Sequence, residues 1–233
     1  ALGFDLRAGV TDQVYRGTQG EFELGSRAVR STAGLVMTHG GSVITAFFHS
    51  ACGFATASPE ESFRSVRPRQ YLRSVSDAHG RGYYCEGSPR FRWRVEWSGV
   101  ELADVLRRTM PRALGIDANF VSEILDVEVR DTGPSGRVTE IRVYVDQGEI
   151  PVFGPDARAV FQTLDAKSLG STAVQLTKER ENGRLTRLIA TGAGWGHGVG
   201  MCQVGAYGMA IDGADAEEIL KTYYRGIELD QVY

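Results

Sequence analysis

The sequence has no long hydrophobic run, little net charge and few cysteines, and each shortage limits what the protein can be. No apolar stretch approaches the roughly 20 residues of a membrane-spanning helix, so we expect no transmembrane segment in this chain. A formal net charge of −3 over 233 residues gives no strong positive field, which argues against nucleic acid as a partner. Three cysteines cannot all pair within one chain, so their number leaves the redox compartment open.

Glycine, by contrast, is abundant, at 29 of the 233 residues, against an average of about 7%. The hydrophobic content of 42% and the charged content of 24% are those of an ordinary globular protein, and the chain is long enough to bury a real core. Excess glycine predicts turns and close backbone approaches rather than long helices. Strand-like and helix-like patterns are interspersed, so we predict an α+β fold of mixed sheets and short helices, with a central region that carries the site.

The first third of the chain predicts strands joined by a glycine turn, followed by a short helix. Residues 28–37 and 42–48 have strand-like composition, and Gly40-Gly41 between them predicts a hairpin turn. We expect residues 42–48 to form a mostly buried strand. The run Ser58-Pro59-Glu60-Glu61 is typical of a helix start, with serine as the cap. Capping explains the two adjacent carboxylates better than acid–base chemistry does.

The middle of the chain predicts a smaller α+β lobe inserted at residues 86–165 into a core formed by residues 1–85 and 166–233. Within the lobe we expect strands at 91–97, 124–130 and 137–145, a helix opened by a capping box of Ser98 and Glu101, and a short helix at 158–164. In the second part of the core we expect strands at 172–176 and 185–190, a helix from Met201, and a helix at 214–224.

The stretch TGAGWGHGVGM, residues 191–201, has glycine at every second position from 192 to 200. If it is extended, Trp195 and His197 share one side and the other side is bare backbone. A bare face allows close approach of a second strand or of a ligand, and aromatic rings suit the faces of sugars. The residues alone leave two interpretations open: a tight packing turn with a structural histidine, or a loop that presents both rings to a ligand.

The stretch Phe48-His49-Ser50-Ala51-Cys52-Gly53 places two reactive side chains where a predicted strand opens into a loop. His49, Cys52 and Cys85 together can bind a metal and leave one ligand position open. A disulfide between Cys52 and Cys85, or a nucleophilic Cys52 with His49 as its base, explains the same residues. A third stretch, residues 11–17, alternates polar and aromatic groups and includes Gln13 and Tyr15.

Taken together, these stretches resemble the stage II sporulation protein D family, which includes the LytB-type amidase enhancers. The shared pattern is D-Q-V-Y-x-G, then H-S-x-C-G-x-x-T, then G-x-G-x-G-H-G-V-G-M-x-Q-x-G-A-Y-G-M-A. Further landmarks are Tyr71-Leu72-Arg73-Ser74-Val75, Ser135-Gly136-Arg137-Val138 and residues 218–224. The resemblance extends from about residue 3 to residue 230.

The resemblance implies a protein that acts on peptidoglycan outside the cytoplasm, in the periplasm, in the cell wall or as a secreted protein. It implies glycan strands as the ligand, lytic transglycosylase activity in cell-wall remodelling, and in some members a cell-wall amidase as a partner. The residues that it places against the glycan are Gln13, Tyr15, His49, Ser50, Trp195, His197, Gln203 and Tyr207. A transglycosylase needs one carboxylic acid, which protonates the glycosidic oxygen and later accepts a proton from the sugar's 6-hydroxyl.

The sequence departs from the family pattern at that acid. The family's catalytic glutamate lies upstream of the D-Q-V-Y motif, and Gly3-Phe4-Asp5-Leu6 resembles the segment that follows it. We therefore expect no catalytic residue among these 233 residues, and a non-enzymatic, wall-binding enhancer of an amidase is the alternative. The resemblance to members with the H-S-x-C motif also implies a zinc ion in a structural role, held by His49, Cys52 and Cys85. A disulfide between Cys52 and Cys85 is the alternative.

Overall fold

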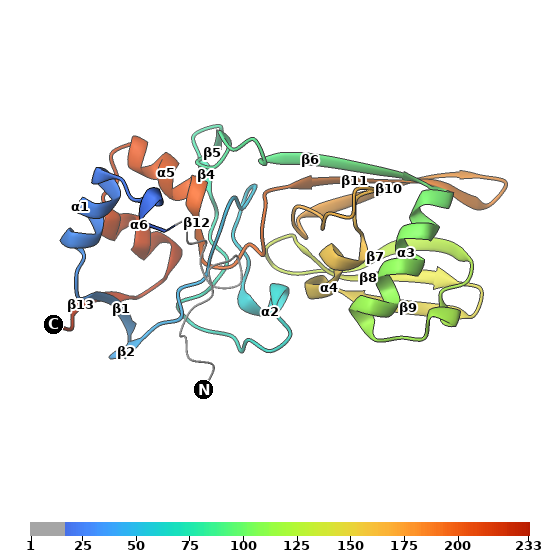
Figure 1. The fold of residues 1–233 in the computed structure, drawn as a ribbon, viewed down its shortest axis with the longest axis horizontal. Coiled ribbons are helices and arrows are strands. Elements are labelled where there is room, and N and C mark those ends of the chain that lie inside the picture. Colours follow the sequence, from blue (N-terminus) through green and yellow to red (C-terminus); the bar gives the residue numbers. More distant parts are fainter. Residues whose placement is uncertain (1–16) are drawn as a thin grey trace. The chain divides into compact units, whose positions relative to one another are not determined.

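The computed structural model describes residues 17–233, which divide into two compact units, residues 17–43 with 228–233 and residues 44–227. Six α-helices and thirteen strands in several small sheets make up the described residues (Figure 1). This confirms the predicted α+β class. The predicted division into a core and a lobe inserted at residues 86–165 stays a prediction. Gln13 and Tyr15 lie outside the described residues.

The first unit is a three-stranded antiparallel sheet with one helix. Strand β1 (Leu35–His39) pairs with β2 (Ser42–Val43) and with the C-terminal strand β13 (Glu228–Gln231). The 3-10 turn η1 (Thr18–Gly20) and the helix α1 (Glu23–Ser31) precede the sheet. Gly40 and Gly41 have φ angles of 58° and 74°, as a two-residue hairpin turn of this type requires, so the predicted turn is confirmed.

The larger unit contains two three-stranded antiparallel sheets. Strands β10 (Val174–Glu181), β11 (Arg184–Ala193) and β6 (Arg92–Ser98) form one, and β7 (Ile124–Thr132), β8 (Val138–Val145) and β9 (Gly148–Phe153) form the other. Helix α3 (Gly99–Leu114) packs against β6, β11 and the short helix α4 (Gly154–Val160), and η2 (Ala118–Phe120) precedes β7. The capping box of Ser98 and Glu101 starts α3 as predicted.

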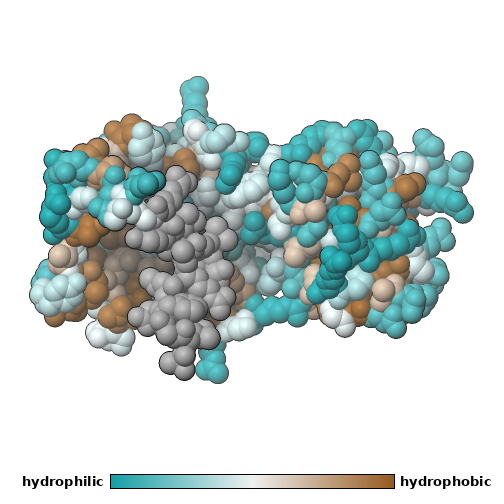
Figure 2. Space-filling view, viewed as in Figure 1, coloured by the Kyte–Doolittle hydropathy of each residue, from teal (hydrophilic) through white to brown (hydrophobic). Residues whose placement is uncertain are grey.

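The hydrophobic core of the larger unit lies among these two sheets, α3 and α4. Its largest fully buried side chains include Trp97, Phe161, Leu102, Leu106 and Met110. Figure 2 shows hydrophilic residues over most of the visible face around α3 and β7–β9, with hydrophobic residues scattered among them. None of the described helices is long and apolar enough to cross a membrane.

The remaining elements of the larger unit are short, and they carry the motifs. Strand β3 (Phe48–His49) pairs in parallel with β12 (Met201–Cys202), and β4 (Ala78–His79) pairs with β5 (Gly82–Tyr83). Helix α2 (Pro59–Ser62) has the predicted capping box. Helix α5 (Gln203–Ile211) follows β12 directly, and α6 (Ala216–Tyr223) completes the unit.

Three local predictions differ from the structure. Residues 42–48 are not one buried strand: only Ser42–Val43 and Phe48–His49 are strand, and Val43 is 67% exposed. Helix α1 occupies the start of the strand predicted at 28–37. The helix predicted at 158–164 begins at Gly154 and ends at Val160, because Pro155 suits the first helical turn.

Candidate functional site

The alternating glycines form an irregular loop rather than an extended strand. Strand β11 ends at Ala193, and Gly194, Gly196, Gly198 and Gly200 have φ angles of 76°, 115°, 84° and 69°. Residues other than glycine rarely adopt these φ angles. The backbone therefore departs from the extended conformation at every second residue, and the two-sided arrangement of a strand does not hold beyond residue 193.

The bare side of this glycine loop (residues 194–200) is filled by the protein itself. A Cβ atom on Gly194 would lie 2.5 Å from the carbonyl oxygen of Ala51, and one on Gly196 would lie 2.9 Å from the Cβ of His49. Hydrogen bonds join Ala51 and Trp195 in both directions, at 3.1 and 2.7 Å. The sequence allowed either a second strand or a ligand to approach the bare backbone. In the structure a second chain segment, residues 47–53, contacts it.

This contact brings two of the predicted site histidines together. The rings of His49 and His197 lie 5.7 Å apart, and the rings of Phe47 and Phe63 also pack on His197, at 6.2 and 5.1 Å. The Nδ1 atom of His197 accepts a hydrogen bond from the amide of Val199 at 3.1 Å. His197 is half-buried, whereas His49 is only 4% exposed.

Both imidazoles are neutral near pH 7. Burial, reinforced by the guanidinium of Arg137, lowers the pKa of His49 to about 3. Burial and the neighbouring His49 lower the pKa of His197 to about 4, and Arg158 and Arg137 act in the same direction. Arg137 is itself completely buried, and its Nε and Nη1 atoms have no hydrogen-bond partner among the described residues. The guanidinium groups of Arg137 and Arg158 are thus close enough to act on the protonation of His197.

The structure places the other predicted glycan-binding residues in different surroundings. The ring of Trp195 is half-buried and lies beneath the guanidinium of Arg90, 4.5 Å from the ring centre. Gln203 and Tyr207 stand one turn apart on the exposed face of α5, where Tyr207 is 67% exposed. Ser50 is half-buried, and its backbone carbonyl accepts a hydrogen bond from the amide of Val204.

Behind the glycine loop lies a buried group of four metal-binding side chains, Cys52, Asp77, Cys85 and Cys202. One ligand atom from each lies within 4.8 Å of all the others. The sulfurs of Cys52 and Cys85 are 3.6 Å apart, and all three cysteines are free thiols. The sequence predicted Cys52 and Cys85 as ligands but missed Asp77 as a ligand and left Cys202 out of the set. The described group does not include His49, whose Nδ1 atom lies 3.2 Å from the carbonyl of Val199.

Electrostatics within this cysteine–aspartate cluster favour a bound cation. Burial raises the pKa of Asp77 to about 7, and hydrogen bonds from the other two thiols lower the pKa of Cys202. Hydrogen bonds to its neighbours raise the pKa of Cys52. Four acidic groups so close together cannot all ionise unless a positive charge joins them.

Surrounding backbone and side-chain groups fix the orientation of the cluster. The amides of Cys52 and Gly205 each point at the Cys202 sulfur at 3.2 Å. Asp77 accepts hydrogen bonds from the Tyr223 hydroxyl at 3.0 Å and from the amide of Cys85 at 2.8 Å. Such outer contacts orient metal ligands in known sites. The structure also excludes Cys52 as an accessible nucleophile, because the side chain is fully buried among the other thiols.

The carboxylates near the loop are structural. Glu61 is 3% exposed and accepts hydrogen bonds from the amide of Ser58 and from the amide and hydroxyl of Ser135. Glu60 pairs with Arg73 at 2.6 Å. The capping role that the sequence predicted is confirmed for Glu61, and both carboxylates line a cavity that shares Phe63, Arg64, Val66 and Pro155 with the cleft at His197.

A cleft of about 540 Å³ opens at His197 and is lined by residues 62–66. Arg158, Pro155 and Thr172 also line it. A second cavity of about 370 Å³ shares Ser65 and Val66 with this cleft and continues to Phe47, Tyr71, Arg67 and Arg69. We call the two together the His197 groove. Trp195, Gln203 and Tyr207 are not among the described residues that line it.

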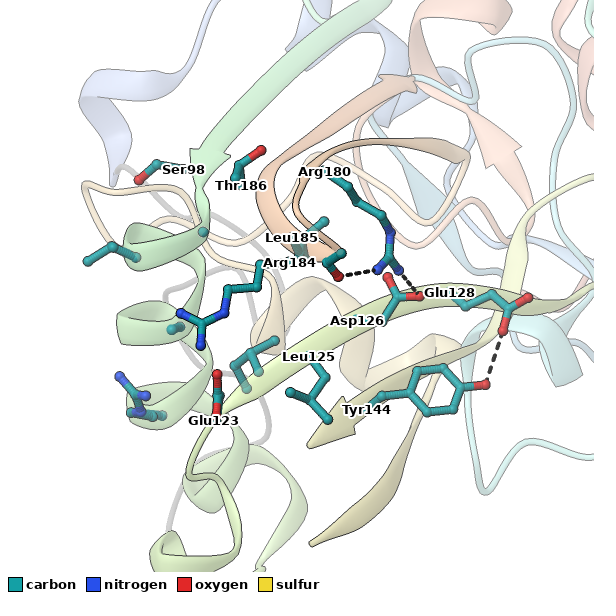
Figure 3. A pocket seen from close by; sticks show the side chains of 16 residues that line it. Ser98, Glu123, Leu125, Asp126, Glu128, Tyr144, Arg180, Arg184, Leu185 and Thr186 are labelled. Carbon is teal, nitrogen blue, oxygen red and sulfur yellow. Dashed lines mark hydrogen bonds and ion pairs between the residues drawn. The ribbon is translucent and has the colours of Figure 1, made fainter. Parts of the chain in front are cut away.

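A larger cavity of about 890 Å³ lies elsewhere in the same unit, among α3, β7 and the β10–β11 hairpin (Figure 3). Some of its polar groups pair with one another: Arg180 pairs with Asp126, and the Tyr144 hydroxyl donates to Glu128 at 3.0 Å (Figure 3). None of the glycan-binding residues predicted from the sequence lines it. We therefore take the His197 groove, and not this cavity, as the candidate site.

Comparison with known proteins defines the class. Residues 52–200 match the family described as Domain of unknown function (DUF8618), and the chain belongs to this family. That segment contains the glycine loop, Cys52 and Cys85, and the His197 groove apart from Phe47 and Thr45.

The individual relatives confirm the resemblance inferred from the motifs. An uncharacterized protein of Brachyspira hyodysenteriae is 32% identical over 228 residues, which is 98% of this chain and 54% of the relative. Stage II sporulation protein D of Bacillus subtilis is 26% identical over 204 residues, 88% of this chain and 50% of its own length. An amidase enhancer of Bacillus subtilis is 24% identical over 236 residues, 88% of this chain and 32% of its own length. The chain thus spans about half or less of the relatives that it matches.

Proposed function

We propose that this chain binds the glycan strands of bacterial peptidoglycan in the His197 groove, outside the cytoplasm. The observation that carries the proposal is the assembly of His197, Phe47 and Phe63 at the edge of an open cleft. Aromatic and neutral imidazole surfaces beside polar groups suit a sugar, which has an apolar face and a rim of hydroxyls. The similarity to stage II sporulation protein D supports this ligand.

Cleavage of the strand requires a carboxylic acid, and no described aspartate or glutamate lines the two cavities of the groove, whereas Glu60, Glu61, Asp131 and Glu140 line the cavity beside them. Glu61 is buried and fully hydrogen-bonded, and Asp77 is buried in the cysteine–aspartate cluster. We propose that lytic transglycosylase activity belongs to a longer protein that adds a glutamate to this groove. When this longer protein is incubated with peptide-free strands, we expect anhydromuramyl ends among the products. If the longer protein has the added glutamate and produces no such ends, the enzymatic proposal is contradicted.

A second candidate is a non-enzymatic enhancer of a cell-wall amidase. Two observations favour it: the similarity to an amidase enhancer, and a groove without a carboxylate among its described lining residues. In this form the chain holds the strand and the amidase performs the hydrolysis. Addition of the chain then accelerates peptide release by a cell-wall amidase without producing anhydromuramyl ends.

We propose zinc as the occupant of the cysteine–aspartate cluster. Two sulfurs bound to one tetrahedral zinc at about 2.3 Å lie about 3.8 Å apart, close to the 3.6 Å between Cys52 and Cys85. Three thiolates and a carboxylate complete a closed set of four ligands, which is typical of structural rather than catalytic zinc. When bound, the ion would supply a cross-link between the segment that carries His49 and the segment that follows the glycine loop.

Sedimentation of the purified chain with peptide-free glycan strands tests the binding proposal. Phe63→Ala removes an aromatic ring that contacts His197 in the groove, and Phe120→Ala removes a partly exposed ring of η2 far along the chain as a matched control. We expect binding by the wild type and the control, and several-fold weaker binding by Phe63→Ala. A folded wild-type chain that binds no strand contradicts the proposal.

A further inference from the structure

The cavity of about 890 Å³ among α3, β7 and the β10–β11 hairpin has walls of opposite charge (Figure 3). The hairpin contributes two arginines, and β7 with the residue before it contributes three carboxylates. These residues are Arg180 and Arg184 of the hairpin, and Glu123, Asp126 and Glu128 of the β7 wall. A ligand with charge of only one sign would be repelled by one of the walls. The cavity therefore suits a ligand that carries charges of both signs.

Two of the charged side chains in this cavity have no partner in the described part of the chain. They are Arg184 and Glu123, and both are exposed. Figure 3 shows both side chains at the cavity, and no ion pair joins them. The other charged groups are paired: Arg180 with Asp126, Glu128 with the Tyr144 hydroxyl, and Arg107 with Asp104. One cation and one anion therefore keep their hydrogen-bonding groups free for a ligand.

Each of the two charged walls contains a β-bulge, and the extra residue of each bulge lines the cavity. The β7–β8 pairing skips Leu125, and the β10–β11 pairing skips Thr186. Both residues line the cavity. A bulge bends its strand and redirects a side chain, and bulges are over-represented beside active sites. Two bulges at one cavity indicate that both strands are shaped around it.

Five apolar residues also line the cavity: Val100, Ala103, Ile124, Leu125 and Leu185. Val100 is 74% exposed and Leu125 is 42% exposed, so a ligand that covers them removes apolar surface from water. A pocket of roughly 300–1,000 Å³ with an apolar lining and a few placed polar groups is typical of ligand sites. In this arrangement the apolar surface contributes affinity, and the two unpaired charges fix the orientation of the ligand.

We infer that this cavity binds a short peptide with a free ammonium group and a free carboxylate, which pair with Glu123 and Arg184. A guanidinium can offer two parallel hydrogen bonds to a carboxylate, and a glutamate accepts hydrogen bonds from an ammonium group. Small apolar groups between the two charges then contact Val100 and Leu125, which line the same cavity. No residue lines both this cavity and the His197 groove, so the peptide and the glycan occupy separate sites.

In the bacterial wall this chemistry belongs to the stem peptide. Its diamino acid has a free ammonium group wherever the peptide is not cross-linked, its glutamate and its C-terminus supply carboxylates, and its alanines supply small apolar side chains. The choice of this peptide rests on the proposed binding of peptidoglycan, whereas the requirement for two opposite charges rests on the cavity alone.

The test compares three peptides by isothermal titration. They are a stem tripeptide of alanine, glutamate and a diamino acid with a free side-chain amine, the same tripeptide with that amine acetylated, and the same tripeptide with its carboxylates amidated. We expect each modification to weaken binding about fivefold, since an ion pair at an exposed site contributes up to roughly that factor. Both differences should shrink at high salt, because salt screens exposed charges.

Variants assign each charge to its residue. Glu123→Gln should remove the difference between the free and the acetylated peptide, and Arg184→Gln should remove the difference between the free and the amidated peptide. Both positions are exposed, so both variants should fold. Arg112→Gln removes an exposed arginine at the end of α3, outside the cavity, and should leave all three affinities unchanged. Arg184→Gln should also leave the binding of peptide-free strands unchanged, whereas Phe63→Ala should weaken the binding of strands alone.

The outcomes separate this inference from the proposed function. A folded wild type that binds peptide-free strands but no tripeptide overturns the inference and leaves glycan binding intact. A wild type that binds the tripeptide but no strand supports the inference and overturns glycan binding. Equal affinity for the three peptides overturns the pairing with Glu123 and Arg184, and tripeptide binding that Phe63→Ala weakens places the peptide in the His197 groove instead. Protection of the cavity amides from hydrogen exchange by a cell-wall amidase, and by no tripeptide, overturns the peptide as the occupant.

Discussion

Protonation of His49 should destabilise the fold in mild acid, and the structure gives the size of the effect. The ring is 4% exposed, its Nε2 atom has no partner among the described residues, and its pKa is lowered to about 3. In the unfolded chain the pKa is about 6.5. Between these two values the unfolded state binds a proton that the folded state does not, so stability falls as pH decreases from about 6.5.

The linkage relation gives the magnitude. For a histidine with these two pKa values, lowering the pH from 7 to 5 decreases the free energy of unfolding by about 2 kcal/mol. Urea unfolding of the wild type and of His49→Gln at both pH values isolates this contribution, because the other titrating groups remain in both proteins. From pH 7 to pH 5, the free energy of unfolding should fall by about 2 kcal/mol more in the wild type than in His49→Gln.

Two results would refute the reasoning. One is an equal loss of stability in the wild type and in His49→Gln between the two pH values. The other is an NMR titration of the folded wild type in which the His49 ring is protonated with a pKa near its ordinary value, a measurement that remains possible if the variant does not fold.

Three further predictions concern the loop, the cluster and the buried carboxylate. Gly194→Ala should lower the unfolding free energy by at least about 2 kcal/mol, against about 1 kcal/mol for Gly40→Ala, where alanine only adopts a left-handed φ angle. The difference arises because the Gly194 Cβ would also lie 2.5 Å from a backbone carbonyl oxygen, whereas nothing lies near that of Gly40. Equal losses would disprove the close approach. Elemental analysis should find about one zinc per wild-type chain and much less in Cys202→Ala, and a variant that keeps its zinc would remove Cys202 from the ligand set. Glu61→Gln should cost about 1–3 kcal/mol of stability without changing glycan affinity; weaker binding with unchanged stability would make Glu61 part of the site.

The sequence predicted the elements whose patterns are local. Strands β6, β7, β8, β10 and β11 and the capping boxes of α2 and α3 are visible in alternation and in the spacing of serine and glutamate. The failure at residues 42–48 has a physical cause. Residues 42–48 have the composition of a buried strand, yet Ser42–Val43 lies in one unit and Phe48–His49 in the other. Composition alone does not show where a chain passes between two units.

The candidate site was predictable in part. The sequence predicted Cys52 and Cys85 as partners in a metal site or a disulfide, and their sulfurs lie 3.6 Å apart. It named no partner for the bare backbone of the glycine loop, which contacts residues 47–53. Asp77 has no metal-ligand spacing to any cysteine, and only the folded chain brings it to the cluster. Arg158 and residues 62–66 belong to no motif, so no sequence pattern indicated that they line the groove.

Hydrogen–deuterium exchange of the chain with and without peptide-free glycan strands tests the central claim most directly. If the strand binds in the His197 groove, amides of residues 62–66 and of the glycine loop gain protection, while those around the larger cavity at α3 and β7 do not change. Protection confined to the larger cavity, or no protection under conditions where the strand is bound, would contradict the account.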